Sequence, residues 1–236
     1  MIELNADIGE GCDDAGLMPY LSRVSIACGG HAGDAASMTA ALRLAAEHGV
    51  AAGAHPSYPD RTQFGRRALP ASEDDIVAWV AQQTEVLAEQ AARLGLRLAH
   101  VKPHGALYNV AARDPAVAQA IAQAVAALDP SLLLVGLSGS ELVAAGTGAG
   151  LRVLNEAFAD RRYLADGQLV SRETAGALIT DPAQAAAQAL ALARSGSIAT
   201  QDGGSLRLRA DTLCLHGDTP DALNIARAVH AALNRA

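Results

Sequence analysis

Seven short apolar runs alternate with longer, alanine-rich segments, and this alternation limits the possible folds more than any other feature of the sequence. The apolar runs resemble buried strands in length and composition, and the segments between them have helical character. Buried strands that alternate with helices are typical of a parallel sheet covered by helices. We expect strands at residues 2–8, 24–29, 50–55, 97–102, 132–137, 152–158 and 212–216. We expect helices at residues 35–48, 72–94, 115–128, 139–148, 182–193 and 220–236.

The number of strand–helix units indicates how this sheet is arranged. Seven units in 236 residues predict an α/β fold, an irregular (β/α) barrel of about seven parallel strands that forms a single domain over residues 1–236. Residues 163–172 interrupt the pattern, because an Asp-Gly pair lies between short apolar runs there; we expect a β-hairpin insertion. Gly203 and Gly204 predict a second hairpin before the last strand.

Five of the expected helices begin with a capping signal. Asp34 and Ser72 are typical N-cap residues, because their side chains accept hydrogen bonds from the first helical turn. Three further capping residues each precede a proline, which favours the first turn of a helix; these are Asp114, Asp181 and Thr219.

The composition excludes several classes of function. Half of the residues are apolar, which is enough for a large core. Aromatic residues make up only 3% and the net charge is −7, so we expect no nucleic-acid partner. No run approaches the roughly 18 apolar residues of a membrane helix, and the first residues lack the apolar centre of a signal peptide. The three cysteines form no C-x-x-C pair and are expected as free thiols, so we predict a cytoplasmic protein that does not contact membranes.

Polar and titratable residues lie at the ends of six of the seven expected strands. Alternate side chains of a strand share one face, so these residues can point into the barrel mouth while their neighbours pack against helices. Active sites of such barrels are built from several strand ends at once. We therefore expect the active site among Asn5, Asp7, Glu10, His31, Asp34, His55, Ser57, Asp60, His100, Lys102, His104, Glu156, Asp160, His216 and Asp218.

The histidines fall into separate groups. His48 and His230 lie on expected helices, where a helix-end or packing role is sufficient. His100 lies within an expected strand and is open to two interpretations, a core residue or a functional one. The other four follow apolar strands beside Gly or Pro, and we expect them to be functional: His31, His55, His104 and His216.

A carboxylate and two imidazoles from neighbouring strand ends suit a divalent metal ion. Asp7, His31 and His55 form such a set. The alternative is a hydrogen-bonded polar network without a metal, and no H-E-x-x-H motif decides between the two.

Lys102 is the only lysine among 18 basic residues. Its position between Val101 and Pro103, inside an expected strand, argues against a solvated surface role. A partly buried lysine can polarise a carbonyl group or hold a phosphate or carboxylate. The glycine-rich segment 28–34 matches neither common nucleotide-binding motif. Arg66, in the loop after the third strand, is a candidate to bind a carboxylate.

Six ordered motifs together resemble one known family. They are LNADIGEG (4–11), ACGGHAGD (27–34), GAHPSYPDRTQFGRR (53–67), VKPHGALYN (101–109), EAFADRRYLADGQLVSR (156–172) and CLHGDTPDA (214–222). With these motifs the chain resembles the LamB/YcsF family almost from end to end. The sequence departs from the usual pattern at Ala6, where Cys is usual, at Gly30, where Phe is common, and in a short loop after Glu10. Ala6 argues against a cysteine nucleophile there.

The resemblance implies a barrel related to polysaccharide-deacetylase-like folds and a role in ATP-dependent 5-oxoprolinase. That activity opens the lactam of 5-oxo-L-proline (pyroglutamate) to give L-glutamate, ADP and phosphate, and it implies two partner subunits, B and C. Two alternatives remain: a metal-dependent deacetylase or amidohydrolase that acts on a small amide without ATP, and a non-catalytic subunit that only binds substrate.

Lactam hydrolysis suggests a role for each group of residues. Lys102 would stabilise the developing oxyanion or phosphate, and Asp7 or Glu10 with His55 or His104 would activate water and move the proton. Arg66 or Arg161 would hold the substrate carboxylate. The further residues expected to contact substrate are Asn5, His31, Glu156, His216 and Asp218.

Overall fold

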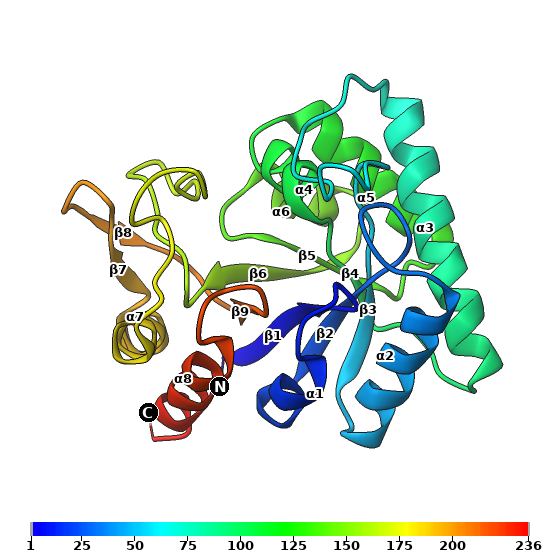
Figure 1. The fold of residues 1–236 in the computed structure, drawn as a ribbon. Helices are drawn as coiled ribbons and strands as arrows, with labels where there is room; N and C mark the ends of the chain where they lie inside the picture. Colours follow the sequence, from blue (N-terminus) through cyan, green and yellow to red (C-terminus); the bar gives the residue numbers. More distant parts are fainter. Residues whose placement is uncertain (1, 236) are drawn as a thin grey trace.

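Seven parallel strands close into a barrel in the computed structural model, which describes residues 2–235. The strand order is β1-β2-β3-β4-β5-β6-β9, and β9 pairs with β1 to complete the circle (Figure 1). The predicted barrel of about seven parallel strands is confirmed. Its strands are β1 (Glu3–Ile8), β2 (Arg23–Ala27), β3 (Ala51–His55), β4 (His100–Val101), β5 (Leu133–Leu137), β6 (Arg152–Phe158) and β9 (Thr212–His216).

The register of the barrel brings the predicted polar residues to the same end. Asp7 on β1 is level with Ser25 on β2 and with His216 on β9. Ala27, the last residue of β2, is level with His55, the last residue of β3. Because all pairs are parallel, the carboxyl ends of the strands form one mouth.

β4 is much shorter than predicted. The strand expected at 97–102 contains only two residues, although the chain still follows β3 on both sides of it: the Ala99 amide donates to Ala52 and the Lys102 amide to Ala54, at 2.8 and 2.9 Å. Pro103 lacks an N–H group and cannot continue the ladder. Lys102 therefore stands just beyond the end of β4, at the mouth.

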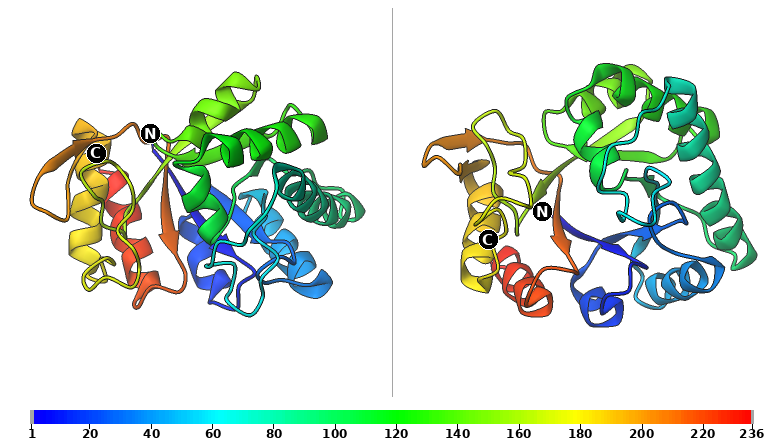
Figure 2. Two further views of the ribbon diagram at one scale, coloured as in Figure 1. Left: turned by 90° about the horizontal axis from the view of Figure 1, so that it is seen from above. Right: turned by 45° about the horizontal axis from the view of Figure 1, so that its top comes forward.

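The helices surround the barrel (Figure 2). Those that the sequence predicts are α2 (Ala35–Glu47), α3 (Glu73–Arg93), α5 (Pro115–Leu128), α6 (Glu141–Gly148), α7 (Pro182–Ser195) and α8 (Ala222–Leu233). Three short elements were not predicted: α1 (Asp14–Leu17), the 3-10 helix η1 (Met18–Tyr20) and α4 (Gly105–Ala111). α4 begins directly after His104 and so extends the strand end at which Lys102 lies.

Most of the predicted helix starts are confirmed. Four capping side chains accept hydrogen bonds from first-turn amides as expected: Asp34, Ser72, Asp114 and Asp181. Thr219 does not cap α8, which begins only at Ala222 after Asp221. Instead, the Thr219 hydroxyl donates to Asp160 Oδ2 at 3.0 Å, so a tertiary contact replaces the local one.

The chain leaves the barrel between β6 and β9. In the segment expected as a hairpin insertion, Tyr163 forms an isolated antiparallel bridge with Leu169, and Arg161 forms another with Leu178. After α7, the antiparallel strands β7 (Ser197–Ala199) and β8 (Ser205–Arg207) form a separate two-stranded sheet beside the barrel (Figure 1), at the second predicted hairpin. Among residues 2–235, no helix combines the length and the apolar character needed to cross a bilayer.

His100 lies inside the barrel against the neighbouring strands. Its Nε2 atom lies 3.2 Å from the Ser25 hydroxyl, and burial lowers its pKa to about 3, so the ring is neutral. The ring packs over Gly53, where an added Cβ would lie 2.5 Å from three ring atoms. This environment is that of a core histidine, one of the two interpretations open from the sequence.

We expect Gly53→Ala to reduce the free energy of unfolding by about 1–3 kcal/mol, because the new methyl group overpacks the barrel against His100. Urea denaturation measures this change. Gly148→Ala at the end of α6 is the matched control: its Cβ would have no neighbour within 4 Å, so we expect unchanged or slightly increased stability. Equal stability of the two variants would contradict the tight packing of His100 on Gly53.

Candidate active site

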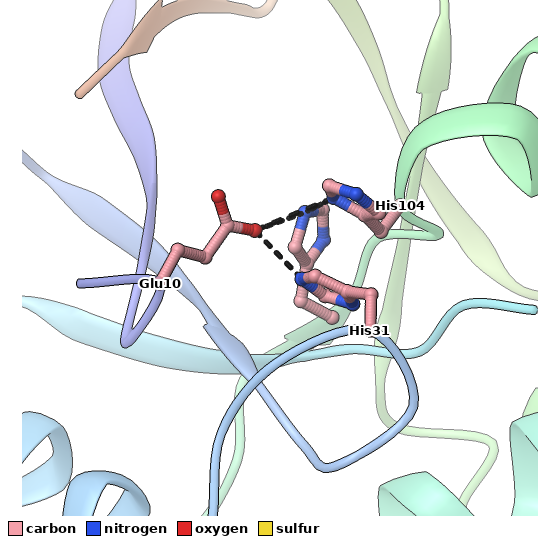
Figure 3. Close-up of side chains that lie close together, drawn as sticks. Glu10, His31 and His104 are labelled. Atoms are coloured by element: carbon pink, nitrogen blue, oxygen red, sulfur yellow. Dashed lines mark hydrogen bonds and ion pairs between the residues drawn. The ribbon is translucent and has the colours of Figure 1, made fainter. Parts of the chain in front are cut away.

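Three histidines and one glutamate meet at the barrel mouth, and we call them the histidine–glutamate cluster: Glu10, His31, His55 and His104. Glu10 Oε1 lies 2.7 Å from His31 Nε2 and 3.3 Å from His104 Nδ1 (Figure 3). It lies 3.8 Å from His55 Nε2. The rings of His31 and His104 are stacked, with centroids 3.6 Å apart. Glu10, His31 and His104 follow β1, β2 and β4, and His55 is the last residue of β3. Four neighbouring strands therefore contribute one side chain each.

A glycine turn after β2 brings His31 into this cluster. Gly29 and Gly33 have φ values of +101° and +87°, which residues other than glycine rarely adopt. A Cβ on Gly33 would also collide with the Ala27 carbonyl oxygen. Arg61 donates to the carbonyl oxygens of both glycines, at 3.1 and 2.9 Å. The glycine-rich segment of the sequence thus serves as a tight turn that positions His31.

Gly30, one of the departures from the usual family pattern, has a local explanation. A Cβ there would collide with the side chains of Gln83 and Ser57. Gln83, from α3, accepts a hydrogen bond from the Ser57 amide at 3.0 Å and donates to the Ser57 carbonyl at 2.8 Å. Gln83 therefore fixes the loop after β3. The side chains of Gln83 and Ser57 occupy the space that a larger residue at position 30 would need.

Backbone contacts orient two of the histidines. His55 Nδ1 lies 2.7 Å from the Lys102 carbonyl oxygen, and His104 Nε2 lies 3.0 Å from the Phe64 carbonyl oxygen. A carbonyl oxygen only accepts hydrogen bonds, so these ring nitrogens carry the protons. In the neutral rings, His55 Nε2 and His104 Nδ1 then present lone pairs toward each other and toward Glu10.

A second group of side chains, which we call the lysine centre, surrounds the Lys102 ammonium: Asn5, Asp7, Glu156 and Cys214. Lys102 Nζ lies 2.9 Å from Asp7 Oδ1 and 2.8 Å from Glu156 Oε1. It also lies 3.2 Å from both Asn5 Oδ1 and Cys214 Sγ. The Lys102 side chain is only 3% exposed, which excludes the solvated surface role. Cys214, one of the three expected free thiols, therefore also lines the site.

Tyr108 is a site residue that the sequence analysis missed. Its hydroxyl donates to Glu156 Oε2 at 2.7 Å from α4, the helix that was not predicted. Burial and the neighbouring Glu156 charge raise the pKa of Tyr108 well above its usual value, so the phenol keeps its proton. The available signal was its position in VKPHGALYN, close to Lys102 in the chain.

The charges of the lysine centre support one another. Burial opposes the ammonium form of Lys102, but the Asp7 and Glu156 carboxylates outweigh it and raise its pKa well above the usual value. Burial likewise opposes the charged form of Asp7, but His55 and Lys102 together hold the pKa of this carboxyl well below its usual range. His55 faces burial too, and its contact with Asp7 raises its pKa.

In the rest of the histidine–glutamate cluster, the pKa shifts favour the uncharged form of each side chain. Burial, reinforced by His55, lowers the pKa of His31 to about 2 and that of His104 well below its usual value. Burial raises the pKa of Glu10. His31 and His104 are therefore neutral at pH 7 and can act as lone-pair donors.

His216 lies on the other side of the mouth and belongs to a different network. Its ring Nδ1 lies 3.0 Å from both carboxylate oxygens of Asp160, which is buried and also accepts from the His216 amide at 2.9 Å. The ring stacks on Phe158, with centroids 5.4 Å apart. Asp160 thus fixes the ring of His216 beside the lysine centre.

The predicted substrate arginines occupy different environments. Arg66 is exposed at the rim and already paired with Asp218, at 2.5 Å; Asp218 also accepts from Arg172. Arg161 is buried and donates to the Val170 carbonyl oxygen at 2.6 Å. Its Nε atom has no hydrogen-bond partner among residues 2–235. Burial lowers its pKa to about 10, so it remains charged at pH 7.

The predicted metal set is divided between two groups. His31 and His55 lie together, but Glu10 and His104 complete their group, whereas Asp7 lies with Cys214 and His216 in another. Asp7 Oδ1 contacts Lys102, and only Oδ2 reaches the cluster, 3.3 Å from His55 Nε2. The position of Asp7 at a neighbouring strand end suggested that it would join His31 and His55. Instead, one of its carboxylate oxygens pairs with Lys102.

We expect Lys102→Met to lower the free energy of unfolding at pH 7 by about 3–5 kcal/mol, because it leaves the Asp7 and Glu156 carboxylates buried without their cation. Asp7, whose pKa is lowered in the folded chain, stabilises that chain above about pH 4, its unfolded pKa. Without Lys102 this contribution is weakened, so the deficit relative to the wild type is constant above about pH 4 and shrinks as the pH falls below that value. Urea denaturation at several pH values measures it.

The double variant Lys102→Met/Glu156→Gln is the control for this effect. It removes one of the two uncompensated charges and recovers part of the lost stability at pH 7. A Lys102→Met variant as stable as the wild type at pH 7 would contradict the ion pairs.

Comparison with known proteins agrees with the sequence motifs. The LamB/YcsF family model matches residues 2–236. A Chloroflexus aggregans protein, named as the A subunit of 5-oxoprolinase, is 52% identical over 241 residues, which cover all of this chain and 96% of that protein. A Bordetella pertussis protein of the same name is 49% identical, over 99% of this chain and 95% of the other. The crystal structure of a lactam utilization protein from Thermus thermophilus superposes with a TM-score of 0.93 at 45% identity, over 99% of this chain and 96% of that one. The chain therefore belongs to the LamB/YcsF family.

Proposed function

We propose that this chain is the subunit of an ATP-dependent 5-oxoprolinase in which the lactam of 5-oxo-L-proline is hydrolysed to L-glutamate. The observation that carries the proposal is the near-complete coverage of relatives that are named as the A subunit of 5-oxoprolinase, at 49–52% identity. Such a name implies a multisubunit complex, and we propose partner subunits B and C in the cytoplasm. The three free cysteines agree with a reducing compartment.

Hydrolysis of a lactam breaks the ring C–N bond, adds hydroxide to the carbonyl carbon and delivers a proton to the nitrogen. The amide is resonance-stabilised, so the carbonyl must be activated first. We propose that the complex consumes ATP by phosphorylating the carbonyl oxygen. One water then adds to the activated carbon and the ring C–N bond breaks, which leaves an acyl phosphate and the amine. A second water hydrolyses the acyl phosphate to L-glutamate and phosphate. The residues of this chain must then stabilise negative charge on that oxygen and move protons.

The lysine centre has the chemistry for the first task. Lys102 is a buried, fully charged ammonium held by Asp7 and Glu156. A fixed cation in a site shielded from water stabilises a developing oxyanion or phosphate more strongly than a solvated one. Asn5 and Glu156 flank the ammonium, and we propose that they contact the substrate.

The residues that connect the lysine centre with the histidine–glutamate cluster have the chemistry for the second task, proton transfer. Asp7 contacts Lys102 through one carboxylate oxygen and His55 through the other, at 2.9 and 3.3 Å. We propose that Asp7 and His55 activate water, and that Glu10 with His104 complete the proton path, because Glu10 Oε1 lies 3.3 Å from His104 Nδ1. We propose that His31, in the histidine–glutamate cluster, and His216, beside Asp7 and Cys214, contact the substrate.

Arg161 is the better candidate for the substrate carboxylate. It is a buried cation with an unpartnered Nε among the described residues, whereas Arg66 is exposed and already paired with Asp218. A substrate carboxylate would supply the acceptor that Arg161 Nε lacks. We assign Arg66 and Asp218 to the rim of the substrate path.

The histidine–glutamate cluster favours a second candidate function, a metal-dependent amidohydrolase that needs no ATP. Three imidazoles and a carboxylate within reach of one point are compatible with a metal centre. This candidate predicts that the chain hydrolyses a small amide by itself. A third candidate, a subunit that binds substrate without catalysis, predicts that acid–base residues are dispensable.

One reconstitution separates these candidates. 5-Oxoproline is incubated with the chain alone and with subunits B and C, each with and without ATP, and glutamate and ADP are measured. We expect equal amounts of glutamate and ADP from the full mixture only. Release by the chain alone without ATP would support the amidohydrolase instead. If the mixture that contains the Asp7→Asn chain releases as much glutamate as the wild type, the result would support the non-catalytic subunit. His48→Ala, on an exposed helix end, is the control variant.

We expect Arg161→Gln to raise the KM for 5-oxoproline by about 10–100-fold in the reconstituted complex, because a charge-assisted hydrogen bond to the carboxylate is lost. The value of kcat should change much less. Arg66→Gln is the matched control and should change KM by less than about threefold, because Arg66 is exposed and paired with Asp218. The reverse order of these two effects would assign the carboxylate to Arg66.

A further inference from the structure

We propose that the histidine–glutamate cluster binds one divalent transition-metal ion of the zinc class, through Glu10 Oε1, His31 Nε2, His55 Nε2 and His104 Nδ1. This ligand set differs from the one that the order of the strand ends suggested, because it contains Glu10 and His104 in place of Asp7. The inference rests on the geometry of the cluster and does not depend on the proposed 5-oxoprolinase activity.

The spacing of the four atoms fits a single ion. Ligands about 2.1 Å from a zinc ion in a tetrahedral arrangement lie about 3.4 Å from one another. The separations from Glu10 Oε1 to the three nitrogens are 2.7, 3.3 and 3.8 Å, and His55 Nε2 lies 3.0 Å from His104 Nδ1. All four atoms lie within 4.8 Å of one another. Small side-chain movements bring them to ligand distance.

The hydrogen bonds outside the cluster direct lone pairs toward its centre. His55 and His104 each use their outer nitrogen to donate to a backbone carbonyl oxygen, that of Lys102 and that of Phe64. Histidine ligands of metals are typically held in this way, because the outer contact fixes both the tautomer and the ring orientation. The facing nitrogens of His55 and His104 lie 3.0 Å apart, a separation that either a proton on His55 or a metal ion between the two can bridge.

The charge of the mouth also favours a cation. Asp7, Glu10 and Glu156 are buried or nearly so, and one ammonium, that of Lys102, stands among them. The three carboxylates outnumber the one ammonium, so the charge of the mouth favours a bound cation. Uncompensated buried charge is unfavourable, so a bound cation stabilises the folded chain.

The loop that contains Phe64 and Gly65 packs tightly against the rings of His31 and His104. The loop after β3 packs on them so closely that a Cβ on Gly65 would lie 2.9 Å from His31 Cβ and 3.1 Å from the His104 ring. Phe64, at a φ of +53°, packs edge-on against both rings, with centroid distances of 5.2 and 5.5 Å. Asp7 connects the cluster with the lysine centre, because its two carboxylate oxygens lie 3.3 Å from His55 Nε2 and 2.9 Å from Lys102 Nζ.

The donor set selects the type of ion. Three imidazole nitrogens and one carboxylate suit Zn²⁺ and its neighbours, such as Co²⁺ and Ni²⁺, whereas Mg²⁺ and Ca²⁺ prefer oxygen ligands. With an ion bound, all four cluster residues act as ligands, so Glu10, His55 and His104 take no part in proton transfer and His31 does not contact substrate. Asp7 remains free for proton transfer.

The test measures metal directly, without turnover. The full-length chain is stripped with a chelator, and Zn²⁺, Co²⁺ and Mg²⁺ are titrated by calorimetry, with bound metal counted by mass spectrometry. We expect one tightly bound Zn²⁺ per chain, a Co²⁺ absorption spectrum typical of nitrogen and oxygen ligands, and no comparable binding of Mg²⁺. Failure to bind any of the transition metals more tightly than millimolar would overturn the proposal.

Substitutions identify the ligands. His104→Gln and Glu10→Gln should each weaken Zn²⁺ binding by about 100-fold or more, since even residues that only orient a ligand change affinity by about 10–100-fold. His216→Gln is the matched control, a histidine of the same mouth outside the cluster, and should bind Zn²⁺ like the wild type. Loss of binding in Asp7→Asn, with His104→Gln and Glu10→Gln unaffected, would establish the alternative set of Asp7, His31 and His55 and refute ours.

Circular dichroism checks that each variant is folded. If a variant is not, X-ray absorption of the zinc-loaded wild-type chain still decides the question. Three imidazole ligands support the proposed site, and two or fewer contradict it. Because none of these readouts involves 5-oxoproline, the metal site and the proposed function can fail independently.

Discussion

The buried ammonium of Lys102 is the interaction on which the rest of the site depends. A charge in the interior is stable only if partners replace the water it has lost. Asp7 on β1 and Glu156 on β6 supply two carboxylates, and Cys214 on β9 lies beside them. The same ammonium allows the two carboxylates to remain charged out of water. One buried lysine and two buried carboxylates therefore stabilise one another at the barrel mouth.

Asp7 connects this lysine centre with the histidine–glutamate cluster. Its two carboxylate oxygens face Lys102 and His55, so the charge state of each group depends on the other. The cluster lies under the tightly packed loop that contains Phe64 and Gly65, and the lysine centre is closed by Tyr108 from α4. Two chemically different groups therefore share one mouth: one offers a fixed positive charge and the other offers lone pairs.

Much of this arrangement was predictable from the sequence, for a local reason. Strand length, apolar runs and capping residues are properties of short segments, so the seven strands and most helix starts follow from them. The exceptions are places where distant contacts decide. β4 is reduced to two residues before Pro103, and Thr219 binds Asp160 instead of capping α8. The short helix α4, with Tyr108, has too few residues to produce a periodic pattern.

The sequence by itself determined that polar side chains gather at one mouth of a parallel barrel, because alternate residues of a strand share a face and all strands run the same way. Only the tertiary structure decided which of them are partners. Asp7 and Glu10 are three residues apart, yet Asp7 lies on β1 and reaches Lys102, whereas Glu10 follows the turn at Gly9, with a φ of +75°, and reaches His31. Which carboxylate meets which cation or imidazole depends on loop conformation, and loop conformation depends on packing between segments far apart in the chain.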